Sequence, residues 1–136
     1  MDTNVMVYAL DATPSHKKEA AEKLLGALLN DKRICLSTQV LQELFVTLTR
    51  KVQKPCSASE ALKHLDDLAA WPVFAVDYDA IRQAGILSSK ARLSFWDALI
   101  VVSASRSGVT SLYTKDLNSG QTILGIRISN PFESIH

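Results

Sequence analysis

The stretch from Ser94 to Asp116, SFWDALIVVSASRSGVTSLYTKD, decides the fold because it joins a buried helix to a strand. Ser94 is a favourable N-cap, and the apolar residues after it predict a helix over 94–107 that is buried on most sides. Gly108 suits the end of that helix, and the residues over 109–114 predict a strand. Asp97 therefore falls in the first turn of the helix, and Asp116 directly follows the strand.

Further helices and strands alternate along the rest of the chain. Helices are predicted over 15–29, 38–51, 57–70 and 77–92, and strands over 34–37, 71–76 and 126–128, the last as an edge strand. The strands are apolar runs rather than alternating patterns, which indicates a parallel sheet covered by helices on both faces. The fold class is therefore α/β, with functional groups expected beyond the carboxyl ends of the strands.

The composition predicts one globular domain over residues 1–136. Hydrophobic residues make up 47% of the chain and the formal net charge is +1, which argues against a disordered protein. No apolar run approaches the ~18 residues of a membrane span, and no basic leader precedes an apolar segment. A cytoplasmic location without membrane contact is therefore expected. The cysteines and histidines are scattered, which excludes a zinc cluster of the usual spacing.

Four acidic residues stand in apolar surroundings: Asp2, Glu43, Asp97 and Asp116. A carboxylate within core-forming sequence is costly unless it is neutralised, and a divalent cation with oxygen ligands neutralises several at once. Each acid also has an ordinary interpretation. Asp2 could cap a helix, Glu43 could lie on a solvated helix face, Asp97 could complete a capping box, and Asp116 could belong to a turn.

The acids lie in short motifs that follow one another in a characteristic order. The motifs are Asp2-Thr3-Asn4, Ser37-Thr38-Gln39-Val40-Leu41-Gln42-Glu43, Phe95-Trp96-Asp97-Ala98-Leu99-Ile100, Thr114-Lys115-Asp116-Leu117-Asn118 with Gly120-Gln121, and Asn130-Pro131-Phe132. Together they resemble the PIN-domain ribonuclease family, in particular the VapC-type toxins of type II toxin–antitoxin systems. The resemblance covers essentially the whole chain. It implies a three-layer α/β/α fold with a central, mostly parallel sheet of four to five strands.

The resemblance also implies roles for individual residues. The four acids would bind metal and carry catalysis, with Asp2 and Asp97 as the main direct ligands and Glu43 and Asp116 acting in part through water. The residues Thr3, Asn4 and Thr114 would support the site. The implied cofactor is Mg²⁺ or Mn²⁺, since Mg²⁺ takes only one or two carboxylates directly and keeps several waters.

By the same resemblance, the protein would be a metal-dependent endoribonuclease that leaves a 5′-phosphate. It would be a homodimer, inhibited by an antitoxin protein and bound to operator DNA only through that antitoxin. Weak candidates for substrate binding are the basic residues Arg50, Lys51, Lys90, Arg92 and Lys115, and further candidates for phosphate contact are Lys54 and Arg106. Trp96 is expected to be half-buried or at a subunit contact, with stacking on a base as the alternative.

Two other functions stay open at this stage. One is a PIN-like interaction module that dimerises and binds an antitoxin with little catalysis. It gains weight because only Met1 precedes Asp2, whereas the family has an apolar strand there. Either that strand is shortened or the natural start lies upstream. The other is a haloacid dehalogenase-type phosphatase, which is disfavoured because it needs a second aspartate where this chain has Asn4.

Overall fold

The computed structural model describes residues 9–10, 16–30, 36–52, 54–113 and 120–130. In chain order, its elements beyond the short turn at 9–10 are α2 (His16–Asn30), β1 (Leu36–Ser37), α3 (Thr38–Val46), the π-helix η1 (Thr47–Lys51), α4 (Ala58–Leu68), β2 (Val73–Phe74), α5 (Tyr78–Ala91), α6 (Phe95–Arg106), β3 (Ser111–Tyr113), β4 (Thr122–Ile123) and β5 (Ile126–Ser129). The helices predicted from sequence are confirmed, with ends that differ by a residue or two.

The helices begin where the sequence offers side-chain caps. Ser37 Oγ accepts a hydrogen bond from the N–H of Val40, and Ser57 Oγ accepts one from the N–H of Glu60. Asp77 caps α5 in the same way, through Ala80 at 2.8 Å. Each cap satisfies a backbone donor that the first helical turn leaves without an intrahelical partner, which explains the accuracy of these boundaries.

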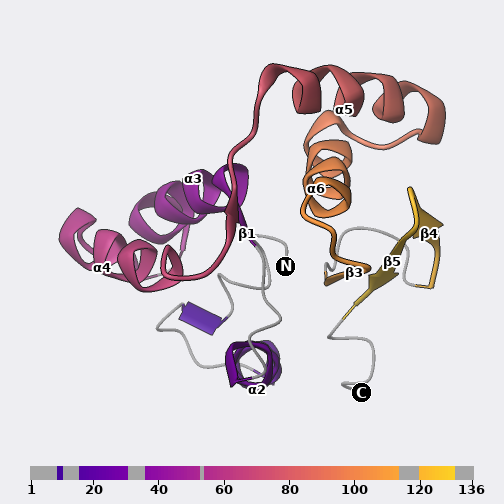
Figure 1. The fold of residues 1–136 in the computed structure, drawn as a ribbon. Helices are drawn as coiled ribbons and strands as arrows, with labels where there is room; N and C mark the ends of the chain where they lie inside the picture. Colours follow the sequence, from indigo (N-terminus) through magenta and orange to yellow (C-terminus); the bar gives the residue numbers. More distant parts are fainter. Residues whose placement is uncertain (1–8, 11–15, 31–35, 53, 114–119, 131–136) are drawn as a thin grey trace.

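The α/β class is confirmed, and the described strand pairing is mostly parallel. Strand β1 pairs in parallel with β2, and β3 pairs in parallel with β5, whereas β4 and β5 are antiparallel. Among the described residues these strands form two sheets, β1–β2 and β3–β5–β4. Figure 1 shows β1 beside α3, and the β3–β5–β4 sheet beyond α6.

The prediction that 126–128 is an edge strand is wrong, because β5 lies between β3 and β4. Strand β4 has no predicted counterpart; it joins β5 through Leu124 and Gly125, both at positive φ. Two positive φ values in a two-residue connection are typical of a hairpin turn of type I′. Leucine is rare in that conformation, so the residue types did not indicate a hairpin.

Helix α6 is the central packing element of the second half of the chain. Its Ala98, Leu99 and Val102 pack with Ala80 and Ala84 of α5. On another face, its Ile100 and Val101 form a cluster with the β3 and β5 side chains Leu112, Ile126 and Ile128. In Figure 1, α6 lies below α5 and leads down to β3. An apolar surface on several sides is what a helix buried within a domain requires, and this prediction is confirmed.

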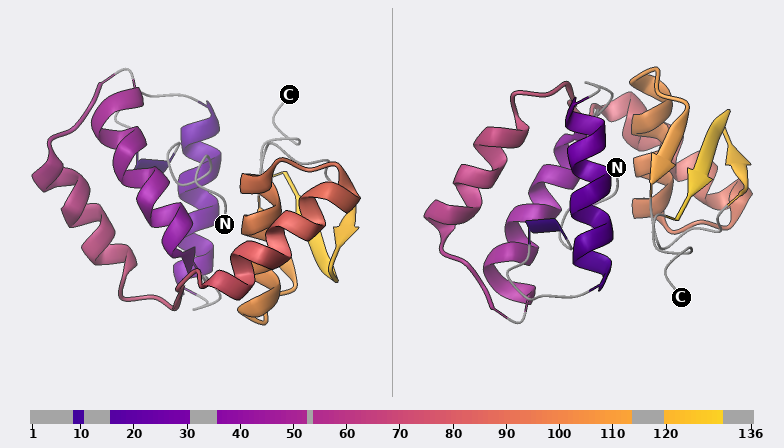
Figure 2. Two further views of the ribbon diagram at one scale, coloured as in Figure 1. Left: turned by 90° about the horizontal axis from the view of Figure 1, so that it is seen from above. Right: turned by 90° about the horizontal axis from the view of Figure 1, so that it is seen from below.

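A second core lies among α2, α3 and α4. Leu44 of α3 is fully buried there, together with Ala21 of α2, Leu36 of β1 and Ala61 of α4. In Figure 1 and Figure 2, these helices lie on the opposite side of the molecule from the β3–β5–β4 sheet. The two cores thus hold α3 and α6, the helices that carry Glu43 and Asp97.

Candidate active site

Helix α3 presents Gln39 and Glu43 one turn apart on the same side. A buried stripe anchors this helix in the core. It consists of Val40 and Leu44 of α3 and Leu48 of η1. Glu43 lies next to that stripe and is only partly accessible, and its Oε1 atom is shielded from solvent. Glu43 is therefore only partly solvated, with one of its two carboxylate oxygens shielded. Carboxylate oxygens are the kind of ligand that hard divalent cations prefer.

Asp97 lies in the first turn of α6, as predicted. Ser94 Oγ caps this helix by accepting a hydrogen bond from the Asp97 N–H at 3.1 Å. The capping contact thus uses the backbone of Asp97, and among the described residues its carboxylate has no hydrogen-bond donor. Asp97 is partly buried, at the positive end of the helix dipole. Capping by Ser94 and metal binding by Asp97 are therefore compatible.

Gln39 connects the two acid-bearing helices. Its side chain is 3% exposed, and its Nε2 donates a hydrogen bond of 3.1 Å to the backbone carbonyl of Trp96, the residue before Asp97. This contact joins the beginning of α3 to the beginning of α6 across 57 positions of sequence. It holds the backbone carbonyl just before Asp97 at the Gln39 side chain, which stands one helical turn before Glu43 on α3.

The sequence analysis missed Gln39 as a functional candidate. A glutamine in the first turn of a helix is ordinarily exposed, and only its position four residues before Glu43 connected it with the site. That spacing was a usable signal, because residues four apart share a helix face. Burial, however, depends on the contact with Trp96, which no local pattern reveals.

The other predicted site residues lie outside the described part of the chain. These are the acids Asp2 and Asp116, the supporting residues Thr3, Asn4 and Thr114, and the basic residue Lys115. Within the described ranges, no group of three or more histidine, cysteine, aspartate or glutamate side chains comes together. The structure thus bears on Glu43 and Asp97 alone among the four acids.

Exposed basic residues lie at two helix ends. Arg50 and Lys51 are exposed in the π-helical turn that ends the helix bearing Glu43. Lys90 is exposed in the last turn of α5, and Arg92 follows as its C-cap with a φ of 55°. Arg92 therefore lies two residues before Ser94, the cap of α6. All four side chains are exposed to solvent.

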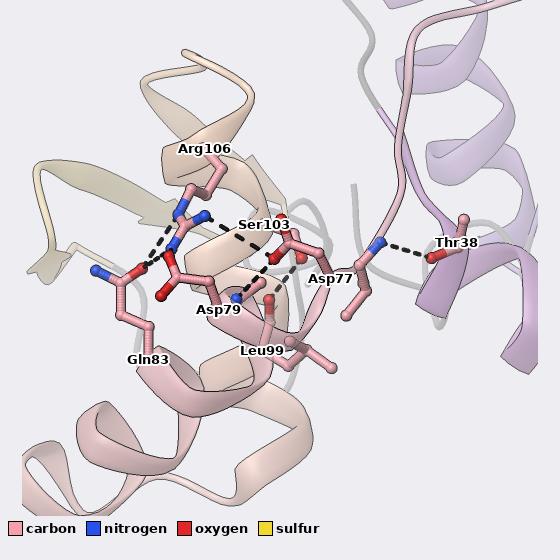
Figure 3. Close-up of polar contacts among 9 residues, drawn as sticks. Thr38, Asp77, Asp79, Gln83, Leu99, Ser103 and Arg106 are labelled. Atoms are coloured by element: carbon pink, nitrogen blue, oxygen red, sulfur yellow. Dashed lines mark hydrogen bonds and ion pairs between the residues drawn. The ribbon is translucent and has the colours of Figure 1, made fainter.

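Arg106 is different, because it is engaged in an ion-pair network (Figure 3). Its guanidinium donates to Gln83 Oε1 at 3.2 and 3.0 Å, pairs with the Asp79 carboxylate, and lies 4.0 Å from Asp77 Oδ1. These contacts tie the last turn of α6 to the first turns of α5. The interpretation of Arg106 as a phosphate contact is therefore not supported.

The network continues towards α3. Thr38 Oγ1 accepts a hydrogen bond of 3.1 Å from the N–H of Val76, the residue before Asp77 (Figure 3). Thr38 is the first residue of α3, so this bond joins α3 to the segment that enters α5. The relative placement of α3 and α6 thus has a direct link, through Gln39 and Trp96, and an indirect one, through Thr38 and Arg106.

Trp96 is not half-buried as expected. Its side chain is 62% exposed, and its ring contacts Phe95 edge-on at a centroid distance of 5.2 Å. An exposed tryptophan next to Asp97 leaves the two other interpretations, a subunit contact and a stacking surface for a base.

Within the described residues, no helix is both long and apolar enough to span a membrane.

The chain matches one known protein family over most of its length. The model of the PIN domain matches residues 1–121, a segment that contains all four predicted acids. No match was found among curated proteins. PIN domains have a three-layer α/β/α fold, are generally nucleases and typically use divalent metal ions. Because the match covers most of the chain, the protein belongs to the PIN domain family.

Proposed function

We propose that this protein is a Mg²⁺- or Mn²⁺-dependent endoribonuclease and the VapC-like toxin of a toxin–antitoxin pair. The observation that supports the proposal is the hydrogen bond from Gln39 to the Trp96 carbonyl, which joins the beginning of the helix bearing Glu43 to the beginning of the helix bearing Asp97. Membership in a nuclease family supports phosphodiester hydrolysis, and the acids supply the oxygen ligands that it requires.

The residues fit a divalent cation of the hard, oxygen-binding kind. Glu43 has a carboxylate oxygen shielded from solvent, and Asp97 is partly buried at a helix N-terminus. Asp2, Glu43, Asp97 and Asp116 would hold the ion, and Thr3, Asn4 and Thr114 would support them. When bound, Mg²⁺ or Mn²⁺ supplies a water of lowered pKa and neutralises charge that develops on the phosphate.

The chain itself would orient the substrate and the carboxylates. Burial of Val40 and Leu44 on α3, and of Ala98 and Leu99 on α6, keeps both acid-bearing helices fixed while a phosphodiester is bound. Such preorganisation lowers the barrier because the charged groups need not rearrange during the reaction. No described histidine has a role here, so the proposal assigns none of them as a general base.

RNA as substrate is supported by the surroundings of Asp97. The exposed ring of Trp96 could stack on an unpaired base, since every base has a π-face. Lys90 and Arg92 lie just before α6, and Arg50 and Lys51 lie at the end of the helix bearing Glu43. Positive charge on both acid-bearing segments would attract the phosphates of a single strand.

A homodimer and an antitoxin are proposed as protein partners, with operator DNA reached only through the antitoxin. Exposed apolar side chains on the first turn of α5 support a protein contact, since Tyr78 is 76% exposed and Ile81 is 43% exposed. They stand three residues apart and so share a helix face. The same surface favours the alternative function, an interaction module with little catalysis.

The decisive test is cleavage of RNA by the purified protein with Mg²⁺, with Mn²⁺ and with EDTA. The test variant is Asp97→Asn, and the matched control is Glu60→Gln. Both residues stand three positions after a serine cap and have their backbone N–H on that serine, but Glu60 is exposed and far from the proposed site in sequence. Metal-dependent cleavage that Asp97→Asn abolishes and Glu60→Gln leaves intact is expected.

A different result would overturn the proposal. If the wild-type protein is folded by circular dichroism but inert with both metals, endoribonuclease activity is refuted for this chain. If Asp97→Asn cleaves as well as Glu60→Gln does, Asp97 is not part of the catalytic site. Binding of a second copy or an antitoxin by an inert protein would then favour the interaction module.

A further inference from the structure

Gln39 carries a buried amide oxygen one helical turn before Glu43. The Gln39 side chain is almost entirely buried, and its Nε2 is used by the Trp96 carbonyl. Its Oε1 is shielded from solvent and has no hydrogen-bond donor among the described residues. Buried polar atoms are nearly always satisfied, so a buried acceptor of this kind indicates a donor that the protein binds.

The position of Gln39 indicates which donor this is. Gln39 stands one helical turn before Glu43, whose Oε1 is also shielded from solvent. Its amide is anchored to the residue that immediately precedes Asp97. An amide oxygen can bind a cation directly or accept a hydrogen bond from a water that a cation holds, and Mg²⁺ keeps several waters.

We infer that Gln39 is a positioning residue of the metal site: it ties Asp97 to the helix of Glu43 and directs Oε1 to the hydration shell of the ion. This inference rests on the proposed function and assigns a role that the four acids do not cover. The amide suits both tasks because it has a donor and an acceptor on one rigid plane. Partners that orient metal ligands in this way typically contribute about 10–100-fold to metal affinity.

The test measures Mn²⁺ affinity by calorimetry, without RNA. The variant Gln39→Met removes the amide at similar length, and Gln42→Met is the matched control, because Gln42 is exposed on the same helix. We expect Gln39→Met to weaken Mn²⁺ binding by about 10–100-fold and Gln42→Met to leave it unchanged. Urea denaturation of both variants without metal separates this effect from a loss of stability.

A second readout follows the site from Trp96. In a Trp71→Phe background, the tryptophan emission, excited selectively over that of the tyrosines, comes from Trp96 alone, since the chain has two tryptophans. The metal should change this emission in the wild-type sequence, because Gln39 holds the Trp96 carbonyl. With Gln39→Met, the change should need a higher Mn²⁺ concentration, by the same factor as in calorimetry.

Gln39→Glu keeps the inference testable if Gln39→Met does not fold. It keeps an acceptor oxygen at this position but loses the Nε2 donor that holds the Trp96 carbonyl, so the Mn²⁺ affinity should change and the Mn²⁺-dependent change in Trp96 emission should be lost. Gln42→Glu adds the same charge at an exposed position and should change neither quantity appreciably.

The outcomes distinguish this inference from the proposed function. If the wild type binds Mn²⁺ and cleaves RNA, but neither Gln39 substitution moves the Mn²⁺ affinity, Gln39 is only a packing residue and the inference fails alone. If the wild type neither binds Mn²⁺ nor cleaves RNA, the inference and the proposed function both fail. Loss of stability in Gln39→Met with unchanged Mn²⁺ affinity also overturns the inference.

Discussion

Replacing Leu44 by alanine tests the placement of the helix that carries Glu43. Leu44 is fully buried, so the change removes three carbon atoms from the core and loses about 2.4 kcal/mol of transfer free energy. The cavity left behind adds to this, because the surrounding helices are fixed by their own packing. The free energy of unfolding should therefore fall by about 3–4 kcal/mol.

Leu62→Ala is the matched control, since Leu62 lies on α4 and is 50% exposed. It should lose roughly 1 kcal/mol, because about half of the side chain is already in water and no closed cavity forms. Urea denaturation followed by circular dichroism measures both variants. With a slope of about 2 kcal/mol/M, Leu44→Ala should lower the midpoint by about 1.5–2 M and Leu62→Ala by about 0.5 M.

Equal shifts for the two variants would refute this reasoning. They would mean that Leu44 is no more buried than Leu62, and that α3 does not pack as described. The side of α3 assigned to Gln39 and Glu43 would then be wrong as well, since the stripe packed in the core with α2 and α4 fixes how α3 is turned about its axis. A large shift for Leu44→Ala alone would support the orientation of the whole helix.

Two further predictions concern the surface. Arg106→Gln should lower the free energy of unfolding by only about 0.5–1 kcal/mol, because the carboxylate partners of Arg106 are mostly exposed, and by less in 1 M NaCl. It should leave the RNA affinity unchanged, and weaker RNA binding would contradict the role of Arg106 as an ion-pair residue. Trp96→Ala, measured by fluorescence anisotropy in an Asp97→Asn background, should weaken single-stranded RNA binding roughly 5–150-fold, the loss of one stacked base. A changed sedimentation coefficient with unchanged RNA affinity would instead make Trp96 a subunit contact.

The helices could be predicted because their signals are local. Ser57 and Ser94 each cap a helix through the residue three positions on, and both caps are present. The apolar run after Asp97 predicted a helix buried on several sides, which α6 is. The candidate acids are predictable for the same reason, since the residue types of the short motifs and their order can be read directly from the sequence.

The strand order could not be predicted. The Leu124–Gly125 turn has no residue types that favour its conformation except the glycine, so the β4–β5 hairpin was missed and β5 was placed at an edge. The engagement of Arg106 depends on Asp79, which lies 27 residues earlier in the chain. Such pairings follow from how α5 packs against α6, and sequence periodicity does not predict them.

By itself, the sequence determined which segments are helical, where α3, α4 and α6 begin, and which acids are candidates for the site. Only the tertiary structure decided that Glu43 is shielded from solvent and that Gln39 is buried against the Trp96 carbonyl. The physical reason is the range of the interactions. Caps and helix periodicity act within a few residues, whereas burial of a polar side chain requires two distant helices to pack together first.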